Sequence, residues 1–186
     1  MMEESKLLLH ICCAPCSIVP VETLRDKGFD AMGFFYRHNI HPYTECLKRQ
    51  DTLESFSKTI NLRVIYQEGY DLERFIQNIV YRETDRCKYC YHDRLRSTAL
   101  VAKRGKFDFF STTLLYSKFQ NHDLIKSIGE SIGRSTGVPF YYHDFREGWK
   151  KGIDDSKSLG LYRQQYCGCI YSEKERYYGH SESSSP

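Results

Sequence analysis

The sequence lacks the features expected of an exported or membrane-embedded protein. Its amino end is polar from Met1 to Lys6, and the apolar run Leu7–Ile11 is too short for the core of a secretory signal. No stretch of the chain approaches the roughly 20 consecutive apolar residues that a membrane-spanning helix needs. We therefore expect a cytosolic protein that does not associate with membranes.

A strong charge of one sign is also missing. The chain has 27 basic and 24 acidic residues, a net charge of +3, whereas a nonspecific nucleic-acid binder is usually more basic. Small basic clusters occur, and we interpret them as solvated surface of mixed charge: Lys48 and Arg49; Arg94, Arg96, Lys103, Arg104 and Lys106; Lys150 and Lys151. Aromatic residues make up 15% of the chain, which permits base stacking without requiring it.

Internal repeats and linkers are absent as well. The length of 186 residues suits a single domain with a full hydrophobic core. We expect one α/β domain over residues 1–180. The small polar residues at the end, 181–186, are predicted to be a disordered tail.

Cysteine, in contrast, is abundant. Seven of the 8 cysteines fall into three tight groups, which are Cys12, Cys13 and Cys16; Cys87 and Cys90; and Cys167 and Cys169. In the reducing cytosol such groups bind metal or carry out redox chemistry more often than they form disulfides. The solitary Cys46 is interpreted as a small buried hydrophobic residue.

The spacing of the cysteines favours an iron–sulfur cluster but leaves zinc open. Only Cys87 and Cys90 have a certain zinc-knuckle spacing, although Cys13 and Cys16 offer a second pair, and no histidine lies at a zinc-finger distance. Irregularly spaced cysteines without histidine are typical of iron–sulfur ligands. A 4Fe–4S cluster needs four thiolates, so the surplus predicts either ligands for a second metal or a redox-active thiol pair.

The hydrophobic pattern alternates between strands and helices. Strands are predicted at residues 6–11, 29–36, 62–66, 107–115 and 138–143. Helices are predicted from Ser17, as the cap, to residue 27, and at residues 43–60, 71–80, 85–103, 121–133 and 162–175, with a loop and a short helix at 148–160. This alternation indicates a parallel sheet flanked by helices.

In parallel sheets ligands gather at the carboxyl ends of the strands. The loop after the first predicted strand carries Cys12, Cys13 and Cys16. Other loops at the same edge carry Tyr70–Asp71, Ser111–Thr113 and Asp144–Arg146. We therefore expect the cysteine groups to converge at this edge.

At this point the motifs resemble those of the QueH-type epoxyqueuosine reductases. The opening His10-Ile-Cys-Cys-Ala-Pro-Cys-Ser17 is followed in order by Arg86-Cys-Lys-Tyr-Cys-Tyr91, Ser111-Thr-Thr-Leu-Leu115 and Asp144-Phe-Arg146, and Asn39-Ile-His-Pro42 also fits. The string Leu161-Tyr-Arg-Gln-Gln-Tyr-Cys-Gly-Cys-Ile-Tyr-Ser172 is the most specific part. The resemblance covers residues 7–173.

The resemblance implies an enzyme that removes the epoxide oxygen of epoxyqueuosine at the wobble position of tRNA, giving queuosine and water. Such a step needs two electrons and two protons, and therefore an electron donor that the sequence does not identify. The implied fold is similar to the adenine-nucleotide alpha-hydrolase (HUP-like) group. A cysteine loop replaces the phosphate-binding Ser-Gly-Gly loop of that group, so we do not expect ATP use, and nothing suggests cobalamin.

We expect the cluster to be a 4Fe–4S cluster bound by two cysteine pairs, Cys87 with Cys90 and Cys167 with Cys169. Cys12 and Cys13 then lie nearest the substrate, as ligands of a second iron or as a thiol pair. Cys16 is counted among the metal ligands, and the partition of the thiolates between these roles stays open.

The epoxide oxygen needs a proton source as well as electrons. Asp71 and Asp144 are the predicted catalytic acids, and Tyr70 and Tyr166 are further candidates. Capping of the following helix is an equally good interpretation of Asp71.

Other side chains have both a structural and a functional interpretation. His10 is interpreted as a buried histidine bonded to a neighbouring strand. The hydroxyls of Ser111–Thr113 and Arg146 are candidates for holding phosphate or the substrate diol, while Tyr89 and Tyr91 either stack on a base or fill the core.

Two other functions compete with the reductase. One is a zinc-stabilised nucleic-acid-binding module without catalysis. The other is a thiol–disulfide oxidoreductase that uses Cys87 and Cys90, which leaves the remaining cysteine groups unexplained.

Overall fold

A computed structural model describes residues 5–178, in which four parallel strands form one sheet in the order β3-β2-β1-β4. The strands are β1 (Ser5–Ile11), β2 (Phe29–Phe35), β3 (Val64–Tyr66) and β4 (Phe109–Thr112). The helices are α1 (Ala14–Asp26), α2 (Tyr43–Thr59), α3 (Leu72–Ile79), α4 (Arg86–Arg104), α5 (His122–Thr136), α6 (Trp149–Ser158) and α7 (Ile170–Tyr177). Short 3-10 turns are η1 (Glu83–Asp85), η2 (Thr113–Tyr116) and η3 (Phe145–Gly148).

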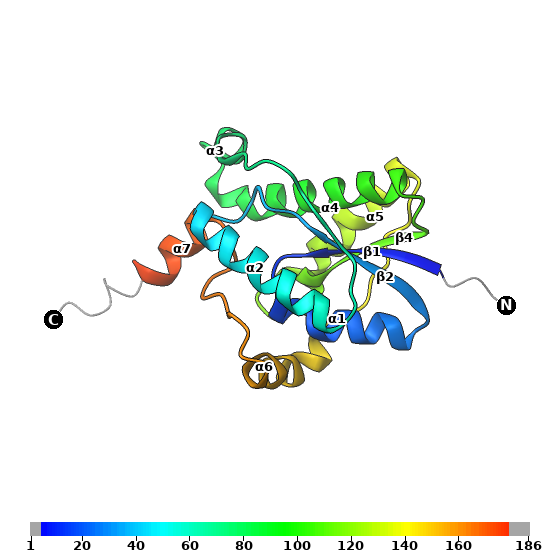
Figure 1. Ribbon diagram of the computed structural model, residues 1–186. Coiled ribbons are helices and arrows are strands. Elements are labelled where there is room, and N and C mark those ends of the chain that lie inside the picture. The colour runs from blue at the N-terminus through cyan, green and yellow to red at the C-terminus, as the bar shows by residue number, and fades with distance from the viewer. Residues whose placement is uncertain (1–4, 179–186) are drawn as a thin grey trace.

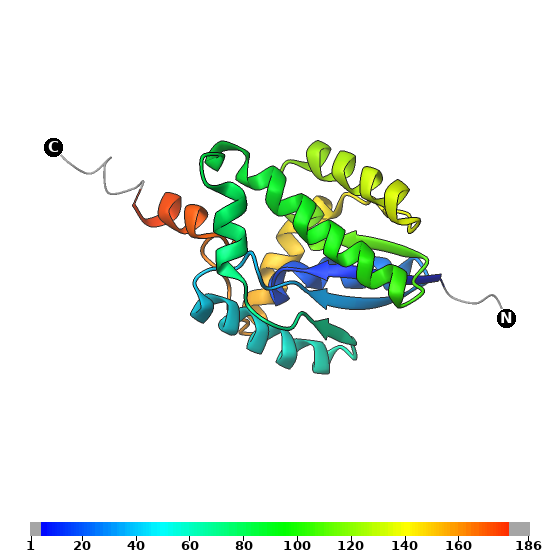
Figure 2. The same ribbon diagram turned by 90° about the horizontal axis from the view of Figure 1, so that it is seen from above.

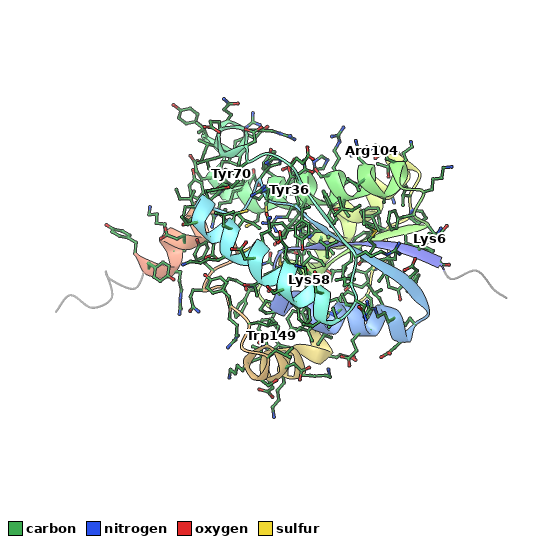
Figure 3. The ribbon with its side chains drawn as sticks, viewed as in Figure 1. Lys6, Tyr36, Lys58, Tyr70, Arg104 and Trp149 are labelled. Atoms are coloured by element: carbon green, nitrogen blue, oxygen red, sulfur yellow. The ribbon has the colours of Figure 1, made fainter. Side chains whose placement is uncertain are left out.

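Helices cover both faces of the sheet. Helices α4 and α5 pack on one face, and α1, with α2 and α6 beside it, lies on the other (Figures 1 and 2). The central strand β1 is buried from Leu7 to Ile11, and all of these residues except His10 are apolar because neither face of the strand meets water. Its carboxyl end points toward α7, whereas Lys6 marks the opposite end of the molecule (Figure 3).

The predicted fold class, a parallel sheet flanked by helices, is confirmed. Most predicted elements occur within a few residues of their expected bounds, Asp71 caps α3, and Cys46 is fully buried. None of the helices among residues 5–178 is both long and apolar enough to cross a membrane. The predicted disordered tail, residues 181–186, lies outside the described residues, and the single domain over 1–180 stays a prediction.

The first helix begins earlier than predicted. It starts at Ala14, and the Cys13 thiol, not the Ser17 hydroxyl, caps it by accepting the Cys16 backbone N–H at 3.4 Å. The Ser17 hydroxyl instead donates to the Ala14 carbonyl. A sulfur cap is not among the usual helix-start signals, which favour Ser, Thr, Asp and Asn.

Two strand predictions also need correction. The fourth strand ends at Thr112 because its hydroxyl accepts the Leu114 backbone N–H and turns the chain into η2. The predicted fifth strand, residues 138–143, forms only an isolated bridge between Phe110 and Phe140. Pro139 has no backbone N–H to extend a ladder there.

The last predicted helix is the largest error. Helix α7 begins only at Ile170, so Cys167 lies in the loop before it and Cys169 at its cap. Gly168 has a φ of 155°, which is not helical, and its carbonyl accepts the His41 backbone N–H. The arginine Arg49 donates to the carbonyls of Tyr166 and Cys167, which a helix would have used internally.

His10 ties the two central strands together, as predicted. Its Nδ1 lies 2.8 Å from the Thr112 hydroxyl on the adjacent strand β4, and its ring is fully buried. Burial, helped by the positive charge of Arg94, lowers the pKa of His10 from 6.5 to about 3. The imidazole is therefore neutral in the folded protein at neutral pH.

We expect acid to destabilise the protein through His10. Between pH 6.5 and about 3 the unfolded chain binds a proton at His10 that the folded protein does not bind, so this contribution to stability is lost as pH falls. From pH 7 to pH 5 it amounts to about 2 kcal/mol. Urea unfolding of the metal-free protein at both pH values should show a smaller loss for His10→Gln than for the parent. The matched change His92→Gln, at an exposed position of α4, should keep the parental loss. Equal losses in parent and His10→Gln would contradict this account.

Candidate metal centre and adjoining cavity

Three thiols lie together where β1 passes into α1. The Sγ atoms of Cys12, Cys13 and Cys16 are all within 4.8 Å of one another, and those of Cys12 and Cys13 are 3.9 Å apart. The sharp turn from strand to helix causes this, because Cys12 directly follows the strand, Cys13 caps the helix and Cys16 lies in its first turn. The Thr113 hydroxyl, 3.5 Å from the Cys12 sulfur, completes the enclosure.

The pKa values of these thiols are shifted in different directions. Hydrogen bonds from Cys13 and Cys16, and then the positive charge of Arg94, hold the pKa of Cys12 well below its usual range despite burial. Burial and the nearby Cys12 sulfur raise the pKa of Cys13. A bound cation would replace the two remaining protons, since metal ligation requires deprotonated thiols. The group therefore fits a single metal ion.

The other four grouped cysteines come from two distant segments. Cys87 and Cys90 lie in the first turns of α4, while Cys167 and Cys169 flank Gly168 in the loop before α7. The side-chain amide of Asn39 donates to the Cys90 sulfur at 3.4 Å. That of Gln120 donates to the Cys167 sulfur, also at 3.4 Å.

Electrostatic interactions connect these four thiols with one another and with the first group. Burial raises the pKa of Cys87 and of Cys90, and the negative charge of nearby thiolates, including Cys169, raises both further. Burial also raises the pKa of Cys167, and the negative charges of Cys12 and Cys169 raise it further. In a 4Fe–4S cluster each thiolate binds a different iron, so its ligand sulfurs lie further apart than those of one ion. Among residues 5–178 no three of these four sulfurs lie within 4.8 Å of one another, which is compatible with ligands on different irons.

Two buried arginines hold the loop that carries Cys167 and Cys169. Arg49 donates to the carbonyls of Tyr166 and Cys167 at 2.9 Å each and pairs with Glu45 at 2.8 Å. Arg94 lies next to the same loop, and both arginines are 1% exposed. The interpretation of these two arginines as solvated surface was therefore wrong, because burial next to thiolates and backbone carbonyls outweighs their preference for water.

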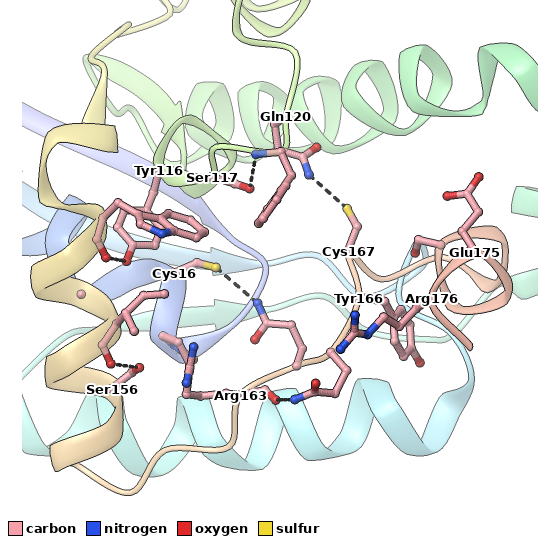
Figure 4. Close-up of a pocket in the computed structure, with 18 residues that line it drawn as sticks. Cys16, Tyr116, Ser117, Gln120, Ser156, Arg163, Tyr166, Cys167, Glu175 and Arg176 are labelled. Atoms are coloured by element: carbon pink, nitrogen blue, oxygen red, sulfur yellow. Dashed lines mark hydrogen bonds between the residues drawn. The ribbon is translucent and has the colours of Figure 1, made fainter. Parts of the chain in front are cut away.

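A cavity of about 510 Å³ opens between the cysteine groups, with Cys16 on one wall and Cys167 on the other (Figure 4). The side-chain amide of Gln164 crosses the cavity floor and donates to the sulfurs of Cys13, at 2.9 Å, and Cys16, at 3.4 Å. Arg163 and Glu175 line the same space. The cavity is thus lined by one thiol of the first group, Cys16, and by one of the other four, Cys167.

One side of the cavity is aromatic. The rings of Tyr116 and Trp149 are tilted by 31° to each other, with centroids 5.1 Å apart, and Phe119 meets Trp149 edge-on at 5.8 Å. The ammonium of Lys118 lies 5.8 Å from the Trp149 ring centre. Phe119 is 85% exposed, which is unusual for a large apolar side chain beside a cavity. Such a wall suits a flat, partly cationic or hydrogen-bonding ligand.

The predicted acids lie elsewhere. Asp71 caps α3 and Asp144 caps η3, where Arg146 lowers the pKa of Asp144 to about 2, and neither carboxylate lines the cavity. Of the tyrosine candidates, Tyr166 lines the cavity but its hydroxyl donates to the His41 carbonyl, and that of Tyr70 donates to the Ile40 carbonyl. The catalytic role of Asp71 and Asp144 stays a prediction.

The hydroxyls of Ser111, Thr112 and Thr113 are fully buried, which argues against phosphate binding at these residues. Tyr91 is also buried and bonds to Gln120, so it belongs to the core.

Sequence reasoning missed several residues of the site. Gln120, Phe119 and Trp149 carry no motif by themselves, and only the fold brings them to the cysteines. Asn39 belongs to a motif string, although its contact with Cys90 was not foreseen. The available signal for Asn39 was its place in the string Asn39-Ile-His-Pro42.

Known proteins of one family are similar to nearly the whole chain. The family model described as epoxyqueuosine reductase QueH matches residues 7–175. Two proteins named epoxyqueuosine reductase QueH are similar to the chain. The protein of Dehalococcoides mccartyi is 35% identical over 92% of this chain and 94% of its own length. The protein of Thermotoga maritima is 36% identical over 96% of this chain and 95% of its own length.

Among solved structures, a predicted subunit of a tRNA methyltransferase from Methanocaldococcus jannaschii has a TM-score of 0.52 at 10% identity. The match covers 81% of this chain and 74% of that one. This likeness concerns the fold alone, a parallel sheet flanked by helices, and the similarity to the adenine-nucleotide alpha-hydrolase group stays a prediction. The match to the family model over nearly the whole chain, together with these relatives, shows that the chain belongs to the QueH family of epoxyqueuosine reductases.

Proposed function

We propose that this protein is an epoxyqueuosine reductase that converts epoxyqueuosine at the tRNA wobble position to queuosine. One observation carries the proposal: in a chain of the QueH family, Cys16 and Cys167, which belong to cysteine groups at opposite ends of the sequence, line one cavity. The reaction breaks both carbon–oxygen bonds of the epoxide, forms a carbon–carbon double bond and releases the oxygen as water. It consumes two electrons and two protons, so a separate low-potential electron donor must supply the enzyme.

The proposed redox centre is a 4Fe–4S cluster held by Cys87, Cys90, Cys167 and Cys169. Cys12, Cys13 and Cys16 would hold a second iron. When bound, these groups supply electrons one at a time and a Lewis acid that polarises the epoxide oxygen. The close approach of the first three sulfurs and the wider spread of the other four support this division.

The protein's own side chains prepare the site in this proposal. Gln164 fixes the sulfurs of Cys13 and Cys16 and forms the floor on which the epoxide ring rests. Gln120 fixes Cys167 on the opposite wall. Hydrogen bonds of this kind orient metal ligands and tune their electron density.

The aromatic wall is the proposed place for the base. The flat deazaguanine ring would lie against Phe119 and Trp149, and its side chain would reach Cys16. An anticodon base is accessible because the loop is single-stranded, and aromatic side chains commonly receive such bases. We place the enzyme in the cytosol, where tRNA is found and where thiols such as these stay reduced.

Metal analysis distinguishes this function from a zinc-stabilised module. Protein reconstituted without oxygen should contain sulfide, and iron in excess of sulfide, because the second ion carries none. Cys87→Ala should lose both iron and sulfide, whereas Cys12→Ala should lose iron and keep its sulfide. Cys46→Ala, a buried cysteine outside the groups, should match the parent. Zinc without sulfide in the parent would reject the iron–sulfur site, and full sulfide in Cys87→Ala would reject the ligand division.

Activity is tested on tRNA that contains epoxyqueuosine. With a low-potential reductant, the modified nucleoside should lose the mass of one oxygen in the presence of enzyme. Cys13→Ala should lower turnover by about 100-fold or more, since it removes a ligand of the proposed second iron. Cys46→Ala again serves as the control. An unchanged nucleoside with fully loaded enzyme would refute the function.

Phe119→Ala should weaken tRNA binding more than it slows the reaction. Stacking of a base on an aromatic side chain is worth about 1–3 kcal/mol, so KM should rise roughly 5- to 150-fold while kcat changes little. Phe119→Trp should restore binding because it keeps an aromatic face. Tyr81→Ala removes another highly exposed aromatic, which does not line the cavity, and should leave KM unchanged. A parental KM in Phe119→Ala would exclude the stacking role.

A further inference from the structure

Arg94 is a buried cation without an acidic partner. It lies on α4, it is 1% exposed, and no ion pair within residues 5–178 includes it. Its Nη2 donates to the Asn39 carbonyl at 3.2 Å, while Nε and Nη1 have no hydrogen-bond partner. A buried charge in this condition is strongly unfavourable unless negative charge lies nearby.

Thiols provide the negative charge around Arg94. Burial by itself lowers the pKa of Arg94, but the thiolates of Cys90, Cys167 and Cys12 reverse this effect and raise its pKa above the ordinary value. These three cysteines represent all three groups of the sequence. The geometry agrees for two of the groups, because Arg94 bonds to Asn39, which donates to Cys90, and lies beside Gly168 between Cys167 and Cys169.

The neighbouring Arg49 differs in one decisive respect. A methyl group placed on Gly168 would lie 3.4 Å from Nη1 of Arg49 and 3.4 Å from Nη2 of Arg94, so both guanidinium groups flank this turn. Arg49 is neutralised by Glu45 and satisfied by two backbone carbonyls. Arg94 has a single carbonyl and no carboxylate, so its charge remains available to the sulfurs.

We propose that Arg94 is a positioning residue that balances the negative charge of the thiolate-bound cluster and raises its reduction potential. The inference rests on the proposed iron–sulfur site. Four thiolates give a 4Fe–4S cluster a net negative charge, and reduction by one electron adds one more negative unit. A fixed cation in a medium of low dielectric constant stabilises the more negative state preferentially.

The connection between Arg94 and the sulfurs runs partly through Asn39. The Asn39 carbonyl accepts the guanidinium, and the side-chain amide of the same residue donates to the Cys90 sulfur. Arg94 thus fixes the backbone that places a hydrogen bond on a proposed ligand. The charge of Arg94 and its placement of Asn39 both favour the reduced cluster, because hydrogen bonds to cluster sulfurs also stabilise the reduced state.

The test measures the midpoint potential of the cluster in reconstituted full-length protein without tRNA. Arg94→Gln removes the charge and Arg94→Lys keeps it. Arg96→Gln removes one positive charge from an exposed position of the same helix. We expect Arg94→Gln to lower the equilibrium constant for one-electron reduction at least tenfold, a shift of about 59 mV to more negative potential. Arg94→Lys and Arg96→Gln should stay close to the parental potential.

A parental potential in loaded Arg94→Gln would overturn the proposal. If Arg94→Gln binds no cluster and Arg94→Lys binds one, the result supports the requirement for positive charge. If neither variant binds a cluster, the shape of the guanidinium is needed and not its charge, and the proposal fails. The midpoint potential is measured without substrate. An enzyme that fails to reduce epoxyqueuosine in tRNA would therefore still give a valid test of Arg94. A parent that binds zinc without sulfide would reject the iron–sulfur site and this inference with it.

Discussion

The site depends on keeping several sulfur atoms close together in a buried place. Thiolates repel one another, and burial raises the pKa of each thiol that is removed from water. The structure meets this constraint with two buried guanidinium groups and with amide donors from Asn39, Gln120 and Gln164. These cations and donors explain why the protein keeps charged and polar groups where a core would normally be apolar. A metal centre would complete the balance, since it replaces protons with positive charge.

The parallel sheet supplies the geometry that makes this possible. The carboxyl ends of its strands lie at one edge, so the loop after β1, the start of α4 and the loop before α7 reach the same place (Figure 1). A fold of this type is shared with a tRNA methyltransferase subunit that has only 10% sequence identity. The scaffold therefore does not determine the chemistry. The cysteines, and the arginines next to them, give this version of the fold its own function.

Much of the fold was predictable from local pattern. The apolar run of β1, the turn residues and the helical periods indicated the strand–helix alternation correctly, because both faces of a parallel sheet are buried. The errors lie where side chains replace backbone hydrogen bonds. Cys13 caps α1 in place of a conventional residue, and Arg49 takes the carbonyls that a helix over residues 162–169 would have used. Pro139 limits the expected fifth strand to a single bridge.

The family, the parallel α/β class and the gathering of cysteines into three groups can be read from the sequence alone. These features depend on residue type and spacing along the chain, which a sequence records directly. The three-dimensional fold was needed to see that Cys12, Cys13 and Cys16 form the close set, that Arg94 is a buried cation, and that Phe119 and Trp149 line the adjoining cavity. The burial and charge environment of a side chain depend on contacts between residues far apart in the chain, and no local pattern contains them.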